Sequence, residues 1–569
     1  MQRKLEAKPT VDPADVESET LTYLSKRAIL PSELVSGKWL FKAATENAQT
    51  CRRLSKARPL GPECQLSWGS CCSGSEGVRF VADALNHVFS QEGSACQLKH
   101  AFSCELHPEK KKWISFVNSC GKVVVDRVLT GAVASDAAEN VVEQADLPCI
   151  FNNILDLGGP SGTAECWQHA GLCRAPSVDV LVLGTSCKDM SRANPSSAVR
   201  RETVLQQQTS KGGSAQTFRG FLLYLDAHRP PIVLFENVDS MEDSKPGGQS
   251  NADIFHAEVS SRGYEAQSVM LDGAQFGLPA RRRRVYMLLI RVAGNPLLSF
   301  EGRPLSAVFN TFRSLLTGCL RKSPCASQVL LSPDDPAVQE ELRARQQKAN
   351  ESNECKKKVG QGRSETVLLG SKWAEQHMQF AENLRLRWGQ PPPAPLARNP
   401  WFQCLTDRET DALPLCQAAL PSSMFRDTTQ SIGRISASTW SPELGAHVAP
   451  TILPRQTLWM ELGEQHSRPM LGREALVFQG FPAFQFVEVV QKCQESAPRS
   501  TAWTPSETLM QDLAGNAMSL PVVLAMLQCG FAAVSWSNNG ASRTADQIPL
   551  STDQAWLYLL FACAPSHMA

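Results

Sequence analysis

The residue with the clearest chemical potential is Cys187, which follows the apolar run VDVLVLG (178–184) and opens a polar loop. Such a run predicts a buried strand, and ligands of open α/β sheets bind beyond the carboxyl ends of the strands. The position therefore favours an exposed nucleophilic thiol, although a core position is the alternative in a chain with 19 cysteines. The loop Lys188–Ser214 has a length typical of a lid. It also carries cations that favour a thiolate, namely Arg192, Arg200, Arg201 and Lys211.

A carboxyl group at the end of the next apolar run, PIVLFENV, complements this thiol. Glu236 and Asn237 lie there, on a strand expected beside the one that precedes Cys187. A thiolate that attacks a heterocyclic ring carbon needs a group that protonates or hydrogen-bonds a ring nitrogen, and Glu236 has that chemistry. The alternative is a Glu-Asn pair that caps the strand.

Three earlier strand ends carry residues suited to a nucleotide-like cofactor. The stretch WGSCCSGSEGVRF (68–80) predicts a strand, a glycine-containing turn and a helix, an arrangement that lets backbone approach a ligand closely. Glu105 and Asp156 end the second and third strands, where Glu105 is placed to accept hydrogen bonds from ribose hydroxyls. The full GxGxxG spacing is absent, which counts against NAD. Each position alone is equally compatible with a solvated strand end.

Three further motifs stand out. The stretch FGLPARRRRVYMLLI places four arginines before a strand, where they contact phosphate and base or form a solvated charge run. REALVFQGFP covers residues 473–482. LAGNAMSLPVV covers residues 513–523, and its Gly-Asn pair inside a helical pattern indicates a close backbone approach.

The elements that position these residues alternate between strand-like and helix-like segments from Leu66 to Ile290. This alternation predicts parallel βαβ units, and hence an α/β Rossmann-like, mostly parallel sheet with helices on both faces. The last two strands are close together in sequence, which predicts an antiparallel strand at that edge. The predicted strands are CQLSWGS, HAFSCE, PCIFNNIL, VDVLVLG, PIVLFENV, YEAQSVML and RRVYMLLI.

Composition limits the remaining possibilities. The 569 residues are 42% hydrophobic and carry a net charge of +1, so overall charge indicates no partner class. The cysteines are scattered without CxxC pairs, which argues against a zinc site and a disulfide scaffold and favours a reduced, intracellular setting. No signal peptide and no membrane-spanning run is visible. The expected domains are an N-terminal extension (1–62), a catalytic domain (63–295), a smaller irregular recognition region (296–455), a return to the catalytic domain (456–535) and a tail (536–569).

The ordered set of motifs resembles the cytosine-C5 DNA methyltransferase family. The residues that carry the resemblance are SCCSGSEG, CELHPE, ILD, GTSCKDMS, FENV, FGLPARRRRV, REALVFQGFP and GNAMSLPVV. The match covers about residues 62–534, and the family places its target-recognition region where residues 296–455 lie. It implies S-adenosylmethionine as cofactor, double-stranded DNA as partner and a nuclear location if the chain is eukaryotic. No metal is expected, because the cysteine spacing argues against a zinc site.

The resemblance also implies residue roles. Cys187 matches the thiol that adds to cytosine C6, Glu236 the acid at N3, and Arg282 and Arg284 the arginine pair near the flipped base and its phosphate. On the cofactor side, Ser73 and Gly74 match residues beside the methionine part, Glu105 the ribose ligand, Asp156 the adenine ligand, and Asn516 the helix Asn beside the cofactor.

Two positions depart from the family pattern. Ser186 replaces the usual proline before the catalytic cysteine, and Ala280 replaces a glutamine before the arginine pair. The proline stiffens the turn that holds the thiol, so these departures keep a catalytically silent, cofactor-binding regulator open as an alternative. An RNA-directed enzyme of the same chemistry is a second alternative, which the length of the recognition region disfavours.

Overall fold

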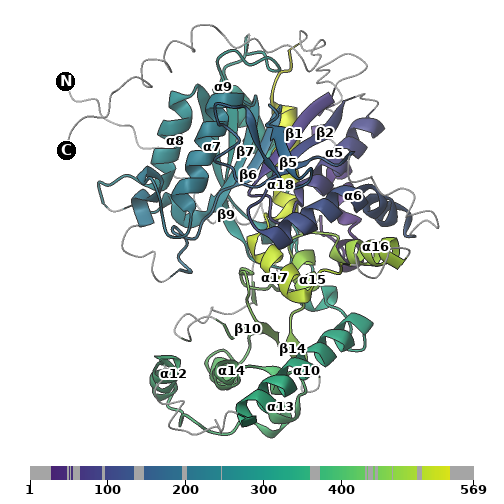
Figure 1. Ribbon diagram of the computed structural model, residues 1–569, viewed down its shortest axis with the longest axis vertical. Helices are drawn as coiled ribbons and strands as arrows, with labels where there is room; N and C mark the ends of the chain where they lie inside the picture. The colour runs from purple at the N-terminus through teal and green to yellow at the C-terminus, as the bar shows by residue number, and fades with distance from the viewer. Residues whose placement is uncertain are drawn as a thin grey trace.

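The computed structural model describes residues 27–537 apart from several gaps (Figure 1). The gaps are 48–49, 52, 55–64, 93–95, 133–145, 195–200, 245, 301, 359–371, 430–431, 433–439, 442–445, 464–465 and 496–502. Within the described ranges, the chain forms a large α/β body and a smaller lobe, which lies below the body in Figure 1.

The body is built on a nine-stranded sheet with the order β5-β4-β3-β2-β1-β6-β7-β9-β8. All seven predicted strands are present, and β1, β2, β3, β6 and β7 are mutually parallel, which confirms the predicted fold class. The strands are β1 (Gln65–Cys71), β2 (Gln97–Cys104), β3 (Cys149–Phe151), β4 (Thr163–Cys166), β5 (Gly171–Arg174), β6 (Val180–Gly184), β7 (Ile232–Val238), β8 (Tyr264–Asp272) and β9 (Arg283–Arg291).

Helices cover both faces of this sheet, as predicted. Alternate residues of β6 enter different cores, with Val180 and Val182 in one and Leu181 and Leu183 in the other. Both faces are buried, so the central strands read as continuous apolar runs. The first core is completed by α3 (Trp39–Glu46), α5 (Val78–Gln91), α6 (Pro108–Thr130), α9 (Leu305–Thr317) and α18 (Leu520–Ala533), and the second by α7 (Ser214–His228) and α8 (Asn251–Ser261).

The two edges of the sheet differ from a simple parallel arrangement. At one edge, β9 lies antiparallel between β7 and β8, which agrees with the predicted antiparallel strand. At the other edge, β4 and β5 form an antiparallel hairpin that the sequence analysis did not predict. Both hairpin strands have only four residues, too few for a clear periodic pattern.

Segments from both ends of the described chain close the body. Near the start, α2 (Pro31–Ser36) precedes α3, whose Trp39 is fully buried. Near the end, the helical pattern around Gly515 and Asn516 forms two helices, α17 (Glu507–Asn516) and α18, with a bend of 40° between them. Every residue of α18 is buried in the core. In the described part of the chain, no single helix is long and apolar enough to cross a membrane.

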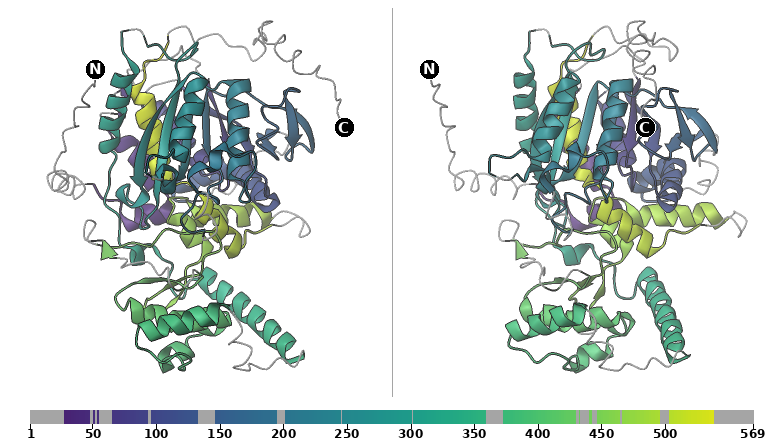
Figure 2. Two further views of the ribbon diagram at one scale, coloured as in Figure 1. Left: turned by 90° about the vertical axis from the view of Figure 1, so that its left-hand side faces the viewer. Right: turned by 60° about the vertical axis from the view of Figure 1, so that its left-hand side comes forward.

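The lobe has small cores of its own and joins the body beside the end of the sheet (Figures 1 and 2). The Arg281 amide donates to the Ala449 carbonyl at 2.8 Å, so the lobe's return segment lies directly beside the arginine run. The chain re-enters the body through α15 (Gly472–Val477) and α16 (Ala483–Glu495). The lobe contains α10 (Pro336–Lys358), α12 (Lys372–Asn383), α13 (Ala394–Arg398), α14 (Asp407–Ala419), β10 (Phe425–Asp427), β11 (Trp440–Ser441), β12 (Ala446–His447), β13 (Leu458–Met460) and β14 (Arg468–Pro469).

Candidate active site and cofactor crevice

Cys187 lies three residues beyond the end of β6, in a turn that hydrogen bonds hold in place. Its carbonyl accepts the amides of Met190 at 3.0 Å and Ser191 at 2.8 Å. The preceding Ser186 donates its amide to Thr217 Oγ1 at 3.0 Å and its hydroxyl to the Gly212 carbonyl at 2.8 Å. Ser186 therefore ties the turn to the start of α7 by hydrogen bonds, where the family uses the stiffness of proline.

Glu236 lies beside this turn because β6 and β7 are paired in register. Gly184 is opposite Glu236, and a Cβ atom on Gly184 would lie 2.9 Å from Glu236 Oε2. The carboxyl group thus occupies the space that a side chain at the end of β6 would fill. Glu236 Oε1 is buried and accepts no hydrogen bond among the described residues. Burial raises the pKa of Glu236, and the charges of Arg282 and Arg284 offset part of that rise.

The side chains of the arginine run alternate between the interior and the surface, as in a strand. Arg282 and Arg284 are buried near Glu236 and Cys187, whereas the Arg281 side chain is 41% exposed and Arg283 is exposed. Arg284 Nε lies 3.5 Å from Glu236 Oε1. The Arg282 guanidinium donates to the Gly515 carbonyl at 3.3 Å, and burial lowers its pKa to about 10.

Among the described residues, the charges that act on the Cys187 thiol come from the arginine pair and Glu236. Burial raises the pKa of Cys187, Arg284 and Arg282 lower it, and Glu236 raises it. The prediction that the loop cations favour the thiolate is wrong for Arg192, since Arg192 pairs with Asp239 and Asp243. Arg200 and the Arg201 side chain lie outside the described residues, and Lys211 is exposed.

Three of the predicted cofactor residues, Ser73, Gly74 and Glu105, directly follow the neighbouring parallel strands β1 and β2. Gly74 has a φ of 53°, and its amide donates to Glu105 Oε2 at 3.0 Å. Ser73 Oγ donates to the Cys104 carbonyl at 3.3 Å, and the Glu105 amide donates to the Phe151 carbonyl at 3.0 Å. These bonds fix the turn after β1 to the end of β2, and the end of β2 to β3.

The remaining two predicted residues differ in their surroundings. Asp156 does not end the third strand as predicted, because β3 ends at Phe151 and Asp156 lies exposed in the turn that follows. Asn516 ends α17, and its side-chain amide donates to the Asp512 carbonyl at 2.7 Å. Its neighbour Gly515 holds Arg282, so this end of α17 lies beside the arginine pair.

Several residues of the site were missed by the sequence analysis. Glu76 is fully buried beneath the Ser73–Gly74 turn, where Ser70 Oγ donates to both carboxyl oxygens, and burial raises the pKa of Glu76 to about 7. Asp189 accepts the Gly212 amide at 2.7 Å and thereby holds the returning end of the loop. Met518 Cε lies 3.1 Å from the position of a Cβ on Gly184. The available signal for Glu76 was an acid between two small residues, Ser75 and Gly77, in a turn after a strand. The positions of Asp189 and Met518 depend on how the loop folds and on the bend between α17 and α18, so the sequence contained no signal for them.

Known proteins resemble this chain over the same region. The sequence pattern of the family described as C-5 cytosine-specific DNA methylase matches residues 168–523. A DNA (cytosine-5-)-methyltransferase, DMT5, of Cryptococcus neoformans is 24% identical over 493 residues, which are 81% of this chain and 17% of that protein. A type II methyltransferase of Bacillus paralicheniformis is 28% identical over 120 residues, 20% of this chain and 25% of that protein. The chain thus spans about a sixth of the length of the first relative and a quarter of the second.

Solved structures resemble the fold at low identity. A DNA modification methyltransferase from an E. coli prophage has a TM-score of 0.37 at 13% identity, covering 82% of this chain and 98% of that one. The Dnmt2 methyltransferase of S. pombe has a TM-score of 0.35 at 14% identity, covering 81% and 97%. The family pattern itself covers more than half of this chain and includes Cys187, Glu236 and the arginine pair. The protein therefore belongs to the C-5 cytosine-specific DNA methylase family.

Proposed function

We propose that this protein transfers a methyl group from S-adenosylmethionine to C5 of a cytosine in double-stranded DNA, through a covalent adduct between Cys187 and C6. The observation that carries the proposal is the convergence of Cys187, just beyond β6, with Glu236 near the end of β7 and Arg284 near the start of the antiparallel β9. Arg284 Nε lies 3.5 Å from Glu236 Oε1, and both residues act on the thiol. A thiol, a buried carboxyl and two cations form the set that addition to a cytosine ring requires.

The residues of the β1–β3 edge fit the proposed cofactor by the chemistry of their groups. Glu105 offers a carboxylate for ribose hydroxyls, Asp156 an exposed carboxylate for the adenine amino group, and Leu106, which is 74% exposed, an apolar surface for a flat ring. The conformation of Gly74 leaves the nearest atom 3.9 Å from the position of a Cβ, so backbone is accessible there. When bound, S-adenosylmethionine supplies an electrophilic methyl group.

Each catalytic group has a definite task in the addition step. The Cys187 thiol gives its proton to solvent, and the sulfur forms a bond to C6 while the C5–C6 π electrons shift to C4–C5 and the C4–N3 π electrons shift onto N3. Glu236, whose pKa is raised by burial, donates a hydrogen bond or proton to N3 and so neutralises the charge that the ring gains. After methylation, the C5 proton leaves to a base, the C5–C6 double bond re-forms and the sulfur departs from C6.

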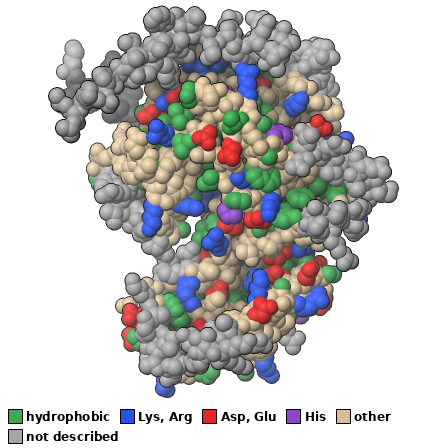
Figure 3. All heavy atoms as spheres, viewed as in Figure 1, with side chains coloured by type: hydrophobic (Ala, Val, Ile, Leu, Met, Phe, Trp, Pro, Cys, Tyr) green, Lys and Arg blue, Asp and Glu red, His purple; other side chains and the backbone are tan. Residues whose placement is uncertain are grey.

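The substrate base must leave the duplex, because stacking covers its C6 face. Base flipping costs roughly a few kcal/mol, which contacts with the backbone must offset. Figure 3 shows Lys and Arg side chains on both sides of the narrowing between body and lobe. DNA affinity from such local cations should fall steeply with salt. A chromosomal substrate would place the protein in the nucleus of a eukaryotic cell.

A trapping experiment tests the proposal. Duplex DNA that contains 5-fluorocytosine blocks loss of the C5 substituent, so the wild-type protein with S-adenosylmethionine should form a covalent complex that survives denaturing electrophoresis. Cys187→Ser should abolish the complex, and Cys404→Ser, in the lobe, should retain it. If the wild type binds S-adenosylmethionine but forms no covalent complex with the DNA, the alternative of a catalytically silent, cofactor-binding regulator is correct. If single-stranded or structured RNA with the same base is trapped instead, the substrate assignment is wrong.

A further inference from the structure

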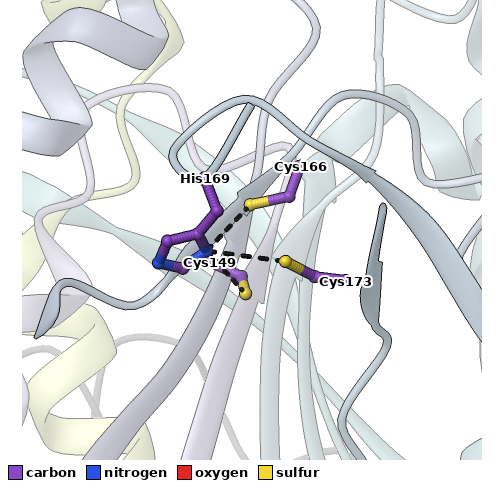
Figure 4. A group of neighbouring side chains, drawn as sticks. All are labelled: Cys149, Cys166, His169 and Cys173. Atoms are coloured by element: carbon purple, nitrogen blue, oxygen red, sulfur yellow. Dashed lines mark hydrogen bonds between the residues drawn. The ribbon is translucent and has the colours of Figure 1, made fainter. Parts of the chain in front are cut away.

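Four side chains of metal-ligand type meet at the β5 edge of the sheet (Figure 4), and the strand order places β1 and β2 between this edge and β6 and β7. Cys149 begins β3, Cys166 ends β4, His169 lies in the hairpin turn and Cys173 lies in β5. Antiparallel pairing brings them together, since Phe151 is opposite Cys166 and Ala164 is opposite Cys173. The four ligand atoms all lie within 4.8 Å of one another.

The distances in this cluster match a tetrahedral metal site. His169 Nδ1 lies 3.5 Å from Cys149 Sγ, 3.4 Å from Cys166 Sγ and 3.5 Å from Cys173 Sγ. Zinc binds cysteine sulfur at ~2.3 Å and histidine nitrogen at ~2.0 Å, so tetrahedral coordination separates the nitrogen from each sulfur by about 3.5 Å. Figure 4 shows the three sulfur atoms gathered around the same ring nitrogen.

Hydrogen bonding alone does not explain this arrangement. One imidazole nitrogen carries either one proton or one lone pair, so it makes one directional hydrogen bond at a time. At most one of the three sulfur contacts is satisfied in that way. A disulfide is no better an explanation, because all three cysteines are present as free thiols and one would remain unpaired in any pairing.

We propose that Cys149, Cys166, His169 and Cys173 bind one Zn²⁺ ion as a closed structural site. Three thiolates and one imidazole select zinc over the hard cations Mg²⁺ and Ca²⁺, which prefer oxygen ligands. Four protein ligands complete a tetrahedron and leave no position for water, which is the arrangement of structural and not catalytic zinc.

The position of the cluster explains what such an ion would do. Strand β5, the outermost of the three, has four residues with none buried, and its Leu172 is 75% exposed, so apolar burial contributes little to holding this strand. The ion would join both sides of the segment 152–165, which carries Asp156. This consequence for the adenine-binding turn rests on the proposed function, whereas metal binding itself does not.

The cysteine spacing predicted no metal, because the sequence contains no CxxC pair. Three of the residues have the spacing Cys166-x2-His169-x3-Cys173. The fourth, Cys149, precedes Cys166 with sixteen residues between them. Strand pairing and not local spacing brings Cys149 to the other three.

Metal content of the full chain tests the proposal. Protein purified with a thiol reductant and without chelator should contain one zinc per chain by inductively coupled plasma mass spectrometry. Cys149→Ser and Cys166→Ser should lose it, and Cys404→Ser should keep it. Cys187→Ser should also keep it while lacking the covalent DNA complex, which separates failure of the zinc site from failure of the proposed function.

A measurement on the wild-type chain covers the case in which the cysteine variants fail to fold. After removal of metal, addition of Co²⁺ should produce the thiolate-to-cobalt charge-transfer absorption and the intense visible bands of tetrahedral cobalt, and Zn²⁺ should remove them. Wild-type protein that holds no zinc and gives no such spectrum would refute the site. Zinc content that is unchanged in a folded Cys149→Ser variant, or a native Cys149–Cys166 disulfide without metal, would also overturn it.

Discussion

Gly184 and Glu236 face each other across β6 and β7, and the Glu236 carboxyl lies 2.9 Å from the place where a Cβ on Gly184 would be. Real Cβ contacts are longer, so any side chain at position 184 must displace the carboxyl group. A displacement of about 1 Å at a catalytic group costs on the order of 100-fold in rate. We therefore expect Gly184→Ala to lower kcat for methyl transfer by about that factor, measured with tritiated S-adenosylmethionine. Gly121→Ala is the control, because its Cβ meets only ordinary contacts at 3.6 Å or more. Unchanged kcat in Gly184→Ala would show that the Glu236 position does not matter.

Arg284 is the cation that most favours the Cys187 thiolate. Arg284→Met should therefore raise the pKa of Cys187 and slow its alkylation by iodoacetamide roughly tenfold per pKa unit. Alkylation of the Cys187 peptide is followed by mass spectrometry between pH 7 and pH 9. Arg283→Met changes the neighbouring exposed residue on the other side of β9 and should leave the alkylation rate unchanged. Equal rates in the two variants would contradict the electrostatic assignment.

Glu76 should make stability depend on pH. Burial raises its pKa from 4.5 to about 7 in the folded protein, so the folded state holds the proton more tightly than the unfolded state. Its contribution is fully present below pH 4.5 and is lost as pH rises towards 7, a decrease on the order of 3 kcal/mol. Glu76→Gln does not ionise, so its Tm should fall less than that of the wild type between pH 5 and pH 8. Glu382→Gln, at an exposed position in α12, should follow the wild type. Parallel curves for wild type and Glu76→Gln would rule out this role.

Ser186 should matter through its hydroxyl group. Its Oγ donates to the Gly212 carbonyl at 2.8 Å, and loss of such a bond costs about 1 kcal/mol. We expect Ser186→Ala to loosen the 188–214 loop, seen as faster cleavage by a nonspecific protease, and to lower kcat several-fold. Ser186→Thr keeps a hydroxyl donor and should behave more like the wild type. If Ser186→Ala and the wild type are cleaved at the same rate, the hydroxyl does not hold the loop.

The amino-acid sequence determined the sheet and most of its candidate site. The central strands are buried on both faces, so they appear as unbroken apolar runs, and the residue after each run is at a carboxyl end whatever the strand order. Cys187, Glu236, Glu105 and Asp156 were found in this way. Strand alternation also predicts that every second arginine of the run faces inward. Four identical residues do not show which two these are, and the resemblance to the family indicated Arg282 and Arg284.

Only the tertiary structure decided which groups act on one another and which residues form the outer edge. Arg192 is close to Cys187 in sequence, yet it pairs with Asp239 and Asp243. Arg284 is distant in sequence, but its position in β9 brings its charge near the Cys187 thiol. The hairpin β4–β5 is too short to leave a periodic pattern, so the sequence showed neither the hairpin nor the meeting of Cys149 with Cys166, His169 and Cys173. An apolar pattern reflects the hydrophobicity of each side chain, which can be read from the sequence. Pairing between short strands depends on their register, which only the folded chain specifies.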